Sequence, residues 1–526
     1  MKKIIQHIQH KLSFSQFNFV SQVFSRNFVS RHTFLFGIAC AGLFACASAF
    51  MGGSTLRAEN AGVPAESEDV MLQAFYWDSY NAGASSTKYG RTKWIDLMKD
   101  TAAITENFDV VWFPPSSGPT GCGVGYSARQ YSSQESDWGT KTALSNLIKA
   151  LHRGNTKVLA DVVVNHRGNY NSWCNFYTDY FGSYGTFTLT QKHIVSNDEC
   201  FSDSKSSCYG ASSSDRGSYD TGDNFNGARD LDHKSEYVQN WAKAYTQWLL
   251  NTINYDGFRY DMTLGFHGRY LKMYNEAAQP YISVSELWSS IDRQKQHLEE
   301  CEYNTMVFDF PMKYSMKGIV TGSYGKLNKS KTFEGLRKHG LERYSVTFID
   351  NHDTFNRGTT YGDNQFTPTT DLTTATNKDY VLQASAYMLM MPGIPCVFYP
   401  HWKSYQSEIG ELIAVRKQAG IHSQSEVLEE ESGQYKYHAT IQGHRGKVIV
   451  RVGKYRSKTQ PEGYELAVEG GDRGAYTVYI AMNPQGINQP TSASSQKGRG
   501  EKFIEDGKLY IRHGEHVYDV FGKIIK

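Results

Sequence analysis

The sequence predicts a (β/α)8 TIM barrel that carries a long insertion and is followed by a separate antiparallel β domain. Three observations lead to this prediction. Eight short apolar runs alternate with helix-like segments, an unusually long polar stretch follows the third run, and alternating stretches broken by Gly and Pro follow the last helix. Apolar strands that alternate with helices indicate a parallel sheet buried on both faces, and eight of them can close into a barrel. A doubly wound open sheet is the alternative.

The predicted strands are short runs that suit a buried sheet. They are VMLQAFYW (70–77), DVVWFPP (109–115), KVLADVVV (157–164), DGFRYDM (256–262), YISVSELW (281–288), NTMVFDF (304–310), SVTFIDN (345–351) and GIPCVFY (393–399). Helix-like segments lie between most of them, such as SEYVQNWAKAYTQWLLNTI (235–253), in which apolar residues recur at helical spacing. We therefore expect the barrel to extend over residues 67–424.

The spacing between the third and fourth predicted strands is irregular. About 90 residues rich in Ser, Gly, Asp and Tyr lie there. An insertion after a barrel strand lies at the C-terminal face, where barrel enzymes have their active sites. We expect residues 167–230 to form an inserted domain that walls the cleft. Beyond it, alternating stretches such as KVIVRV (447–452) and AYTVYIAMN (475–483) predict a β-sandwich domain over residues 425–526.

The N-terminal segment has a different character. No Asp or Glu precedes Glu59, and the apolar run FLFGIACAGLFACASAF (34–50) ends in an A-x-A-type cleavage signature. The run is slightly short for a membrane span. We expect residues 1–66 to be a targeting segment and linker, a mature chain without a stable span, and export from the cytoplasm. A lipoprotein signal at Cys46, or a compound plastid-type signal indicated by ASAF (47–50), are the alternatives.

Composition narrows the class of partner. The net charge of +2 and the pI of about 8.0 give no reason to expect nucleic acid as a partner. Aromatic residues make up 14% of the chain, which fits either a surface that stacks on sugar rings or simple core filling. Three of the cysteines beyond the leader, Cys174, Cys200 and Cys208, fall in one polar stretch. An exported chain could form a disulfide there, but three cysteines cannot all pair, and their spacing matches no zinc pattern.

Polar side chains stand at the C-terminal ends of four predicted strands, where barrel chemistry takes place. They are Asp161, Asn165 and His166, Arg259 and Asp261, Glu286, and His352 and Asp353. Each alone could be a helix cap or a turn residue. Their joint placement brings three carboxylates to one cleft, and a retaining glycosidase needs two flanking the bond. The residues alone therefore favour a barrel hydrolase or lyase acting on a polar substrate.

Five short motifs then resemble a known family in order and spacing. DVVVNH (161–166), GFRYDM (257–262), ELW (286–288) and FIDNHD (348–353) resemble the four sequence regions of the α-amylase family of glycoside hydrolases, family 13. ARDLDH (228–233) resembles a fifth region, which lies in that family's domain B. The similarity extends from about residue 70 to residue 399, and plant-type and bacterial members are the most similar.

The resemblance implies catalytic roles for four residues. Asp261 would be the nucleophile, Glu286 the acid/base, and Asp353 the carboxylate that holds sugar hydroxyls, while Arg259 would support Asp261. The implied activity is endo-hydrolysis of internal α-1,4-glucosidic bonds by a retaining double displacement. A maltogenic amylase or a transglycosylase of the same family uses the same carboxylates and stays an alternative. A non-catalytic glucan-binding homologue is disfavoured because all three carboxylates are present.

The resemblance also implies how the substrate is bound. Tyr126 would stack under the sugar at the cleavage site, and His166 and His352 would hydrogen-bond to it. The partner would be an α-glucan polysaccharide, bound by a monomer.

The resemblance further implies a structural Ca²⁺, with Asn165 and Asp230 as ligands and a backbone carbonyl near Gly265 completing the set. Oxygen donors of this kind suit Ca²⁺. Two positions depart from the family pattern. Leu264 stands where many members have Lys, which leaves the product pattern open, and Arg229 replaces the usual Pro, from which we expect a less rigid strand.

Overall fold

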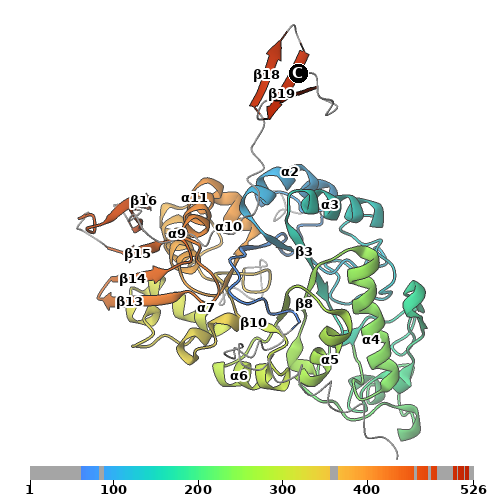
Figure 1. Cartoon of the computed structure of the whole chain (residues 1–526). Helices are drawn as coiled ribbons and strands as arrows, with labels where there is room; N and C mark the ends of the chain where they lie inside the picture. Colours follow the sequence, from blue (N-terminus) through green and yellow to red (C-terminus); the bar gives the residue numbers. More distant parts are fainter. Residues whose placement is uncertain are drawn as a thin grey trace, which may run out of the picture. The chain divides into compact units, whose positions relative to one another are not determined.

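The structure is a computed structural model (Figure 1). It describes residues 61–81, 88–355, 365–454, 459–471 and 475–482, and the backbone of 501–505, 508–513 and 516–519. Most of the predicted targeting segment therefore lies outside the described residues. Among the residues that are described, no helix is long and apolar enough to cross a bilayer.

Eight parallel strands close into a barrel, which confirms the predicted fold class and excludes the open sheet. The strands are β1 (Met71–Gln73), β2 (Val110–Trp112), β3 (Lys157–Val162), β8 (Gly257–Tyr260), β9 (Ser283–Ser285), β10 (Met306–Phe308), β11 (Ser345–Phe348) and β12 (Ile394–Phe398). Each lies within one of the eight predicted apolar runs. Neighbours in the chain are neighbours in the barrel, and the pairing of Met71 with Cys396 closes it.

Helices surround the labelled barrel strands (Figure 1). The α-helices are α2 (Trp94–Asn107), α3 (Lys141–Arg153), α4 (Glu236–Trp248), α5 (Gly268–Ala278), α6 (Ile291–Glu300), α7 (Phe310–Met316), α8 (Gly318–Thr321), α9 (Ala375–Met390), α10 (Tyr399–Ser404) and α11 (Gln406–Ala419). The segment predicted as one helix over 235–253 is α4 continued by a π-helical turn, η5 (Leu249–Ile253). The buried face of α4 includes Val238, Trp241 and Tyr245, which are members of the predicted apolar stripe.

The insertion after β3 is built from short strands and turns. Its strands are β4 (His166–Arg167), β5 (Asp179–Tyr180), β6 (Thr186–Phe187) and β7 (Arg229–Asp230), and its 3-10 turns are η1 (Gly182–Tyr184), η2 (Gln191–His193), η3 (Glu199–Phe201) and η4 (Ser213–Asp215). A buried ion pair joins Arg167 Nη1 to Asp179 Oδ2 at 2.8 Å, and Trp241 Nε1 of α4 donates to the same oxygen at 3.0 Å. These contacts fix the insertion to the barrel wall.

The antiparallel pair β4–β7 brings the start and the end of the insertion together. His166 lies opposite Asp230 in this register. Two of the predicted site residues, about sixty positions apart in sequence, therefore meet at the rim of the barrel.

A five-stranded antiparallel sheet follows the barrel, in the order β13-β14-β15-β17-β16. Its strands are β13 (Glu426–Gly433), β14 (Lys436–Gln442), β15 (Lys447–Gly453), β16 (Tyr464–Gly470) and β17 (Tyr476–Ala481). A second sheet contains β18 (Glu501–Glu505), β19 (Lys508–His513) and β20 (His516–Asp519). The rings of Tyr387 in α9 and Tyr437 in β14 lie 5.2 Å apart, and Arg337 pairs with Glu430 at 2.7 Å, so the first sheet is packed against the barrel helices.

Remaining 3-10 turns connect the barrel elements. They are η6 (Thr263–Gly265), η7 (Tyr324–Leu327), η8 (Leu336–His339) and η9 (Glu342–Tyr344). Inside the barrel, the Trp112 ring lies 5.2 Å from both Phe75 and Phe308 and 5.6 Å from His352. The interior is thus a packed core, as expected for a barrel of this size, and it forms the floor beneath the strand ends.

Candidate active site

A cavity of about 360 Å³ opens at the C-terminal ends of the barrel strands. Its lining residues are Trp77, Tyr126, Ser127, His166, Phe225, Asp261, Met262, Leu264, Glu286, Trp288 and Asp353. The three carboxylates predicted to converge all line it. Arg259 and His352 lie behind its wall, each bonded to a lining residue.

One buried guanidinium holds three carboxylates. Arg259 Nη1 donates to Asp161 Oδ1 at 2.8 Å and to Asp261 Oδ1 at 2.9 Å, and Nη2 lies 2.9 Å from Glu286 Oε2. The guanidinium also lies over the Trp112 ring, 4.9 Å from its centroid. Burial lowers the pKa of Arg259, but the surrounding carboxylates raise it overall, so the cation is permanent. A fixed planar fork of this kind orients each carboxylate that it contacts.

Asp161 is the polar residue inside the apolar run of β3, and its role was not assigned from the sequence. Its Oδ2 accepts hydrogen bonds from Trp112 Nε1 at 3.0 Å and from the Tyr126 hydroxyl at 2.9 Å, while Oδ1 accepts from Arg259. Burial raises the pKa of Asp161 to about 7, although Arg259 opposes this. Asp161 therefore positions both the guanidinium and the aromatic ring that the sequence placed under the sugar.

Asp261 and Glu286 follow directly after two paired strands. Tyr260 of β8 lies opposite Ser285 of β9, so the next residue of each strand reaches the rim side by side. Met262 adopts φ +46°, and its backbone N–H donates to Glu286 Oε2 at 3.0 Å. A non-glycine residue in this left-handed region is uncommon and is often found at functional sites.

The two carboxyl groups share the Arg259 guanidinium and affect each other's pKa. Burial raises the pKa of both Asp261 and Glu286. The interaction between them lowers the pKa of Asp261 and raises that of Glu286. The arrangement therefore favours an ionised Asp261 beside a protonated Glu286.

Three rings form a stacked aromatic surface beside the carboxylates. The Tyr126 ring lies 5.2 Å from His352 and 6.1 Å from Trp77, with interplanar angles of 10° and 6°. Gln73 Nε2 donates to His352 Nδ1 at 3.0 Å, which leaves the imidazole proton on Nε2, 3.1 Å from Asp353 Oδ2. A flat surface that ends in a carboxylate suits a ring that carries hydroxyl groups.

The turn that carries Asp353 is anchored from below. Asp350 is buried and pairs with Lys313 Nζ at 3.2 Å, and its Oδ1 accepts from Thr354 Oγ1 at 2.9 Å. Asn351 Oδ1 accepts from the backbone N–H groups of Asp353 and Thr354 at 3.0 and 2.8 Å. These bonds fix the direction in which the Asp353 side chain points.

His166 lines the opposite side of the cavity. Its Nε2 donates to the Tyr126 carbonyl at 2.8 Å, and its ring lies 4.2 Å from that of Phe225. Burial lowers the pKa of His166 to about 4, so the ring is neutral at pH 7. Phe225, Trp77 and Trp288 are lining residues that sequence reasoning missed, because an aromatic residue in a loop resembles a core filler.

The residues predicted to hold calcium meet at the junction of β3 and the insertion. Asn165 Nδ2 lies 3.3 Å from Asp230 Oδ1, and Asp230 Oδ2 accepts from the Phe225 N–H at 2.8 Å. A Cβ on Gly265 would lie 2.0 Å from Asn165 Oδ1, so only glycine permits this approach. Burial, together with other nearby carboxylates, raises the pKa of Asp230 to about 8. Within the described residues, the hydrogen-bond donors to Asp230 are neutral, and buried oxygen donors around such a carboxylate fit a hard divalent cation.

Asp220 is a further oxygen donor that sequence reasoning missed. Its Oδ1 accepts from the N–H groups of Thr221 and Gly222 at 2.6 and 3.2 Å, whereas its buried Oδ2 has no hydrogen-bond partner among the described residues. Its charge contributes to the raised pKa of Asp230, so the two carboxylates lie near each other. An orphaned buried carboxylate oxygen supports the fit to a cation. In sequence, Asp220 was one acid among many in a polar loop.

Arg229 stands where the family pattern has proline. A proline ring would restrict the backbone, whereas Arg229 is held by contacts of its side chain. Nη1 pairs with Asp198 Oδ1 at 2.6 Å, Nη2 pairs with Glu199, and the guanidinium lies 4.6 Å from the centroid of Trp173. Two ion pairs and a cation–π contact therefore restrain the Arg229 side chain, and the expectation of a less rigid strand stays a prediction. Leu264 lines the cavity and offers it no hydrogen-bond donor.

Comparison with known proteins agrees with this geometry. The family model "Alpha amylase, catalytic domain" matches residues 105–267. The chain is 30% identical over 412 residues to "Probable alpha-amylase 2" of Arabidopsis thaliana, which covers 74% of this chain and 89% of that protein. It is 28% identical over 425 residues to "Alpha-amylase 3, chloroplastic" of the same plant, covering 77% of this chain but only 43% of that protein.

A solved structure shares the fold at low sequence identity. The α-amylase of Anoxybacillus superimposes with a TM-score of 0.55 and 15% identity, over 80% of this chain and 99% of that one. At this identity the similarity shows the fold alone. The family is shown instead by the 30% identity to "Probable alpha-amylase 2", 89% of whose length is covered. The chain belongs to the α-amylase family of glycoside hydrolases.

Proposed function

We propose that the protein hydrolyses internal α-1,4-glucosidic bonds of starch- or glycogen-type glucans with retention of anomeric configuration. The observation that carries the proposal is the pair Asp261 and Glu286, each 2.9 Å from the one Arg259 guanidinium at adjacent strand ends. Inverting enzymes need carboxyl groups roughly 6.5–9.5 Å apart to admit a water, whereas retaining enzymes bring them to about 5–5.5 Å. Two carboxyl groups held on one guanidinium support the retaining arrangement.

The protonation of the pair matches the first chemical step. Ionised Asp261 attacks the anomeric carbon while protonated Glu286 gives its proton to the leaving oxygen. Glu286, now ionised, then takes a proton from the water that releases the sugar from Asp261. Arg259 keeps Asp261 ionised and aimed, and Asp161 keeps Arg259 in place.

The remaining cavity residues would bind the glucan. Tyr126 and Trp77 offer faces on which a sugar ring can stack, and Asp353 offers acceptors for its hydroxyl groups. Trp288 and Phe225 line the same cavity. An aromatic surface with few polar anchors is the usual form of a small-molecule site.

We also propose that Asn165, Asp230 and Asp220, with backbone oxygen near Gly265, hold a Ca²⁺ ion. When bound, the ion would supply the positive charge that ties the insertion to the barrel and keeps the cavity in shape. The protein's own residues perform the bond-breaking steps.

The N-terminal segment supports a location outside the cytosol. It lacks acidic residues up to Glu59 and contains the apolar run ending in a cleavage signature. One relative is named chloroplastic, which is compatible with the plastid-type alternative. N-terminal sequencing of the mature protein tests this proposal, and a mature chain that begins at Met1 would contradict it.

Product analysis on soluble starch tests the proposed reaction. Proton NMR during the first turnovers should show α-anomeric maltooligosaccharides, and the polymer should shorten before maltose accumulates. A first-formed β-anomer would overturn retention. Products longer than a defined maltooligosaccharide substrate would identify a transglycosylase instead.

A further inference from the structure

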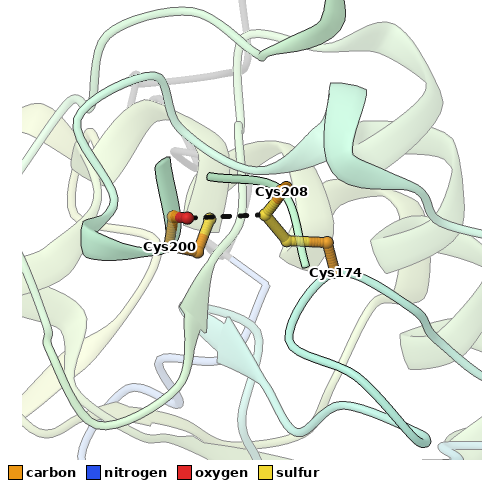
Figure 2. Close-up of side chains that lie close together, drawn as sticks. All are labelled: Cys174, Cys200 and Cys208. Atoms are coloured by element: carbon orange, nitrogen blue, oxygen red, sulfur yellow. Dashed lines mark hydrogen bonds between the residues drawn. A yellow bond between two sulfur atoms is a disulfide. The ribbon is translucent and has the colours of Figure 1, made fainter. Parts of the chain in front are cut away.

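Three cysteine side chains converge inside the inserted domain (Figure 2). Cys174, Cys200 and Cys208 are all buried, and their sulfur atoms lie within 4.8 Å of one another. Cys174 and Cys208 form a disulfide that joins residues 34 positions apart, and Cys200 keeps a free thiol. The sequence predicted that three cysteines could not all pair here, but it did not show which one is left over.

The leftover thiol lies against the disulfide rather than away from it. Cys208 Sγ lies 3.7 Å from the Cys200 carbonyl oxygen, a contact drawn as the dashed line in Figure 2. The Ser206 hydroxyl lies 3.2 Å from Cys208 Sγ and 3.9 Å from Cys174 Sγ. Thiol–disulfide exchange requires an attacking sulfur within reach of the bond and a stabilised leaving sulfur. The cluster provides both.

We propose that this cluster is a thiol–disulfide exchange site in which Cys174 and Cys200 compete for Cys208. The Cys200 sulfur attacks Cys208 Sγ, a new Cys200–Cys208 bond forms, and the Cys174–Cys208 bond breaks. The electron pair of the broken bond stays on Cys174, which receives the proton lost by Cys200. Two thiol-level sulfurs exchange places, so the step needs no external oxidant or reductant.

The surroundings of Cys200 make the exchange slow enough to trap. Burial and the Asp198 carboxylate raise the pKa of the Cys200 thiol, and Arg229 opposes them only in part. Because the thiolate is the attacking species, a thiol held protonated reacts slowly. Blocking the free thiols with N-ethylmaleimide then fixes the isomers that are present, because an alkylated sulfur cannot attack a disulfide.

The exchange would change which arm of the insertion is tied down. In the Cys174–Cys208 form, the tied arm carries Trp173, whose ring covers the Arg229 guanidinium. In the Cys200–Cys208 form, the segment that carries Trp173 is no longer cross-linked. The disulfide then lies two residues from Asp198, the ion-pair partner of Arg229. Arg229 directly precedes Asp230. The exchange itself does not depend on the proposed function. Only its effect on the proposed Ca²⁺ site at Asp230 does.

Tryptic mapping of the full-length protein tests the proposal directly. Cleavage after Arg167, Lys192, Lys205 and Arg216 places each cysteine on its own peptide, namely 168–192, 193–205 and 206–216. The protein is incubated in a glutathione redox buffer, the free thiols are blocked with N-ethylmaleimide, and the digest is run without reductant. We expect peptide 206–216 linked to 168–192 in one fraction and to 193–205 in another.

Variants sharpen the mapping. Cys200→Ser should give only the link between 168–192 and 206–216, and Cys174→Ser should give only the link between 193–205 and 206–216. Cys122→Ser, at a free cysteine outside the cluster, should leave the wild-type mixture unchanged. The wild-type measurement needs no variant, so it decides the matter even if a substituted chain does not fold.

Two results would overturn the proposal. One is a wild-type protein with the 168–192 link alone, in which Cys200 stays alkylatable throughout. The other is a reduced protein that purifies with stoichiometric zinc, lost in Cys200→Ser. The three sulfurs would then be ligands of a soft metal ion rather than exchange partners.

Discussion

Two regions of this molecule bury carboxylates at the barrel rim, and they balance the charge in different ways. At the β8–β9 rim, Asp261 and Glu286 share the resident cation of Arg259. At the β4–β7 corner, Asp230 accepts hydrogen bonds from the Asn165 amide and a backbone N–H, both neutral, in the described part of the chain. The first region carries its own counter-charge, whereas at the second the proposed Ca²⁺ would supply it. The β8–β9 rim therefore carries the residues proposed for catalysis, and the β4–β7 corner carries those proposed to support the insertion.

The largest expected effect comes from removing the acid at the rim. Glu286→Gln keeps the shape of the side chain but cannot donate the proton, so starch hydrolysis should fall by about 10²- to 10⁴-fold. The thermal unfolding temperature should change little, because the amide can still accept from the Met262 N–H. Glu276→Gln, at an exposed glutamate paired with Lys272, is the matched control and should retain activity. Near-wild-type turnover of the Glu286 variant would reject the assignment.

The second largest effect is expected from replacing Arg259, the cation at the β8–β9 rim. Arg259→Met leaves buried Asp161 and Asp261, and half-buried Glu286, without their shared partner, and removing one member of a buried pair costs about 3–5 kcal/mol of unfolding free energy. Arg259→Lys keeps the charge but loses the planar fork, so it should restore part of the stability and little of the activity. Urea unfolding and starch assays measure the two quantities. If the comparison is right, added Ca²⁺ rescues neither variant.

The pH profile is the third test of the rim. Glu286 must be protonated to act as the acid, and burial raises its pKa above the ordinary value of 4.5. Activity should therefore be lost as pH rises through that raised pKa, by about tenfold per pH unit on the alkaline limb. Values of kcat/KM measured from initial rates between pH 4 and pH 10 locate the alkaline limb of the profile. An alkaline limb at the ordinary glutamate pKa would mean that Glu286 is not the acid.

The fourth effect tests the corner that lacks its own cation. Chelation should lower the melting temperature and the activity together, because a bound ligand at 100 times its Kd contributes about 2.7 kcal/mol. Asp230→Asn should weaken Ca²⁺ affinity and make the melting temperature more dependent on added Ca²⁺. Asp223→Asn, at an exposed position in the same loop, is the control. Coincident melting curves with chelator and with excess Ca²⁺ would remove the proposed site.

The same contrast explains what the sequence could and could not predict. The barrel and the rim carboxylates were predictable because a charged group that ends an apolar strand stands out against its neighbours, as Asp261 and Glu286 do. Asp220 stood among many polar residues, and its burial depends on a loop that no local pattern specifies. The bonds of Asp161 depend on tertiary contacts with Trp112 and Tyr126.

The smallest expected effect lies between the two regions, at Leu264. This residue precedes Gly265 of the corner and lines the cavity beside the rim, where many relatives of the family have Lys. An ammonium group offers three hydrogen-bond donors to sugar hydroxyls, whereas a leucine offers none. Leu264→Lys should therefore change the ratio of maltose, maltotriose and longer products more than it changes the rate of starch turnover, a shift of a few-fold. Leu264→Met, which keeps an apolar side chain of similar volume, is the control and should give the wild-type pattern. Product chromatography at equal extents of hydrolysis measures the effect. An unchanged profile in the Lys variant would show that this part of the cavity wall does not contact the leaving sugars.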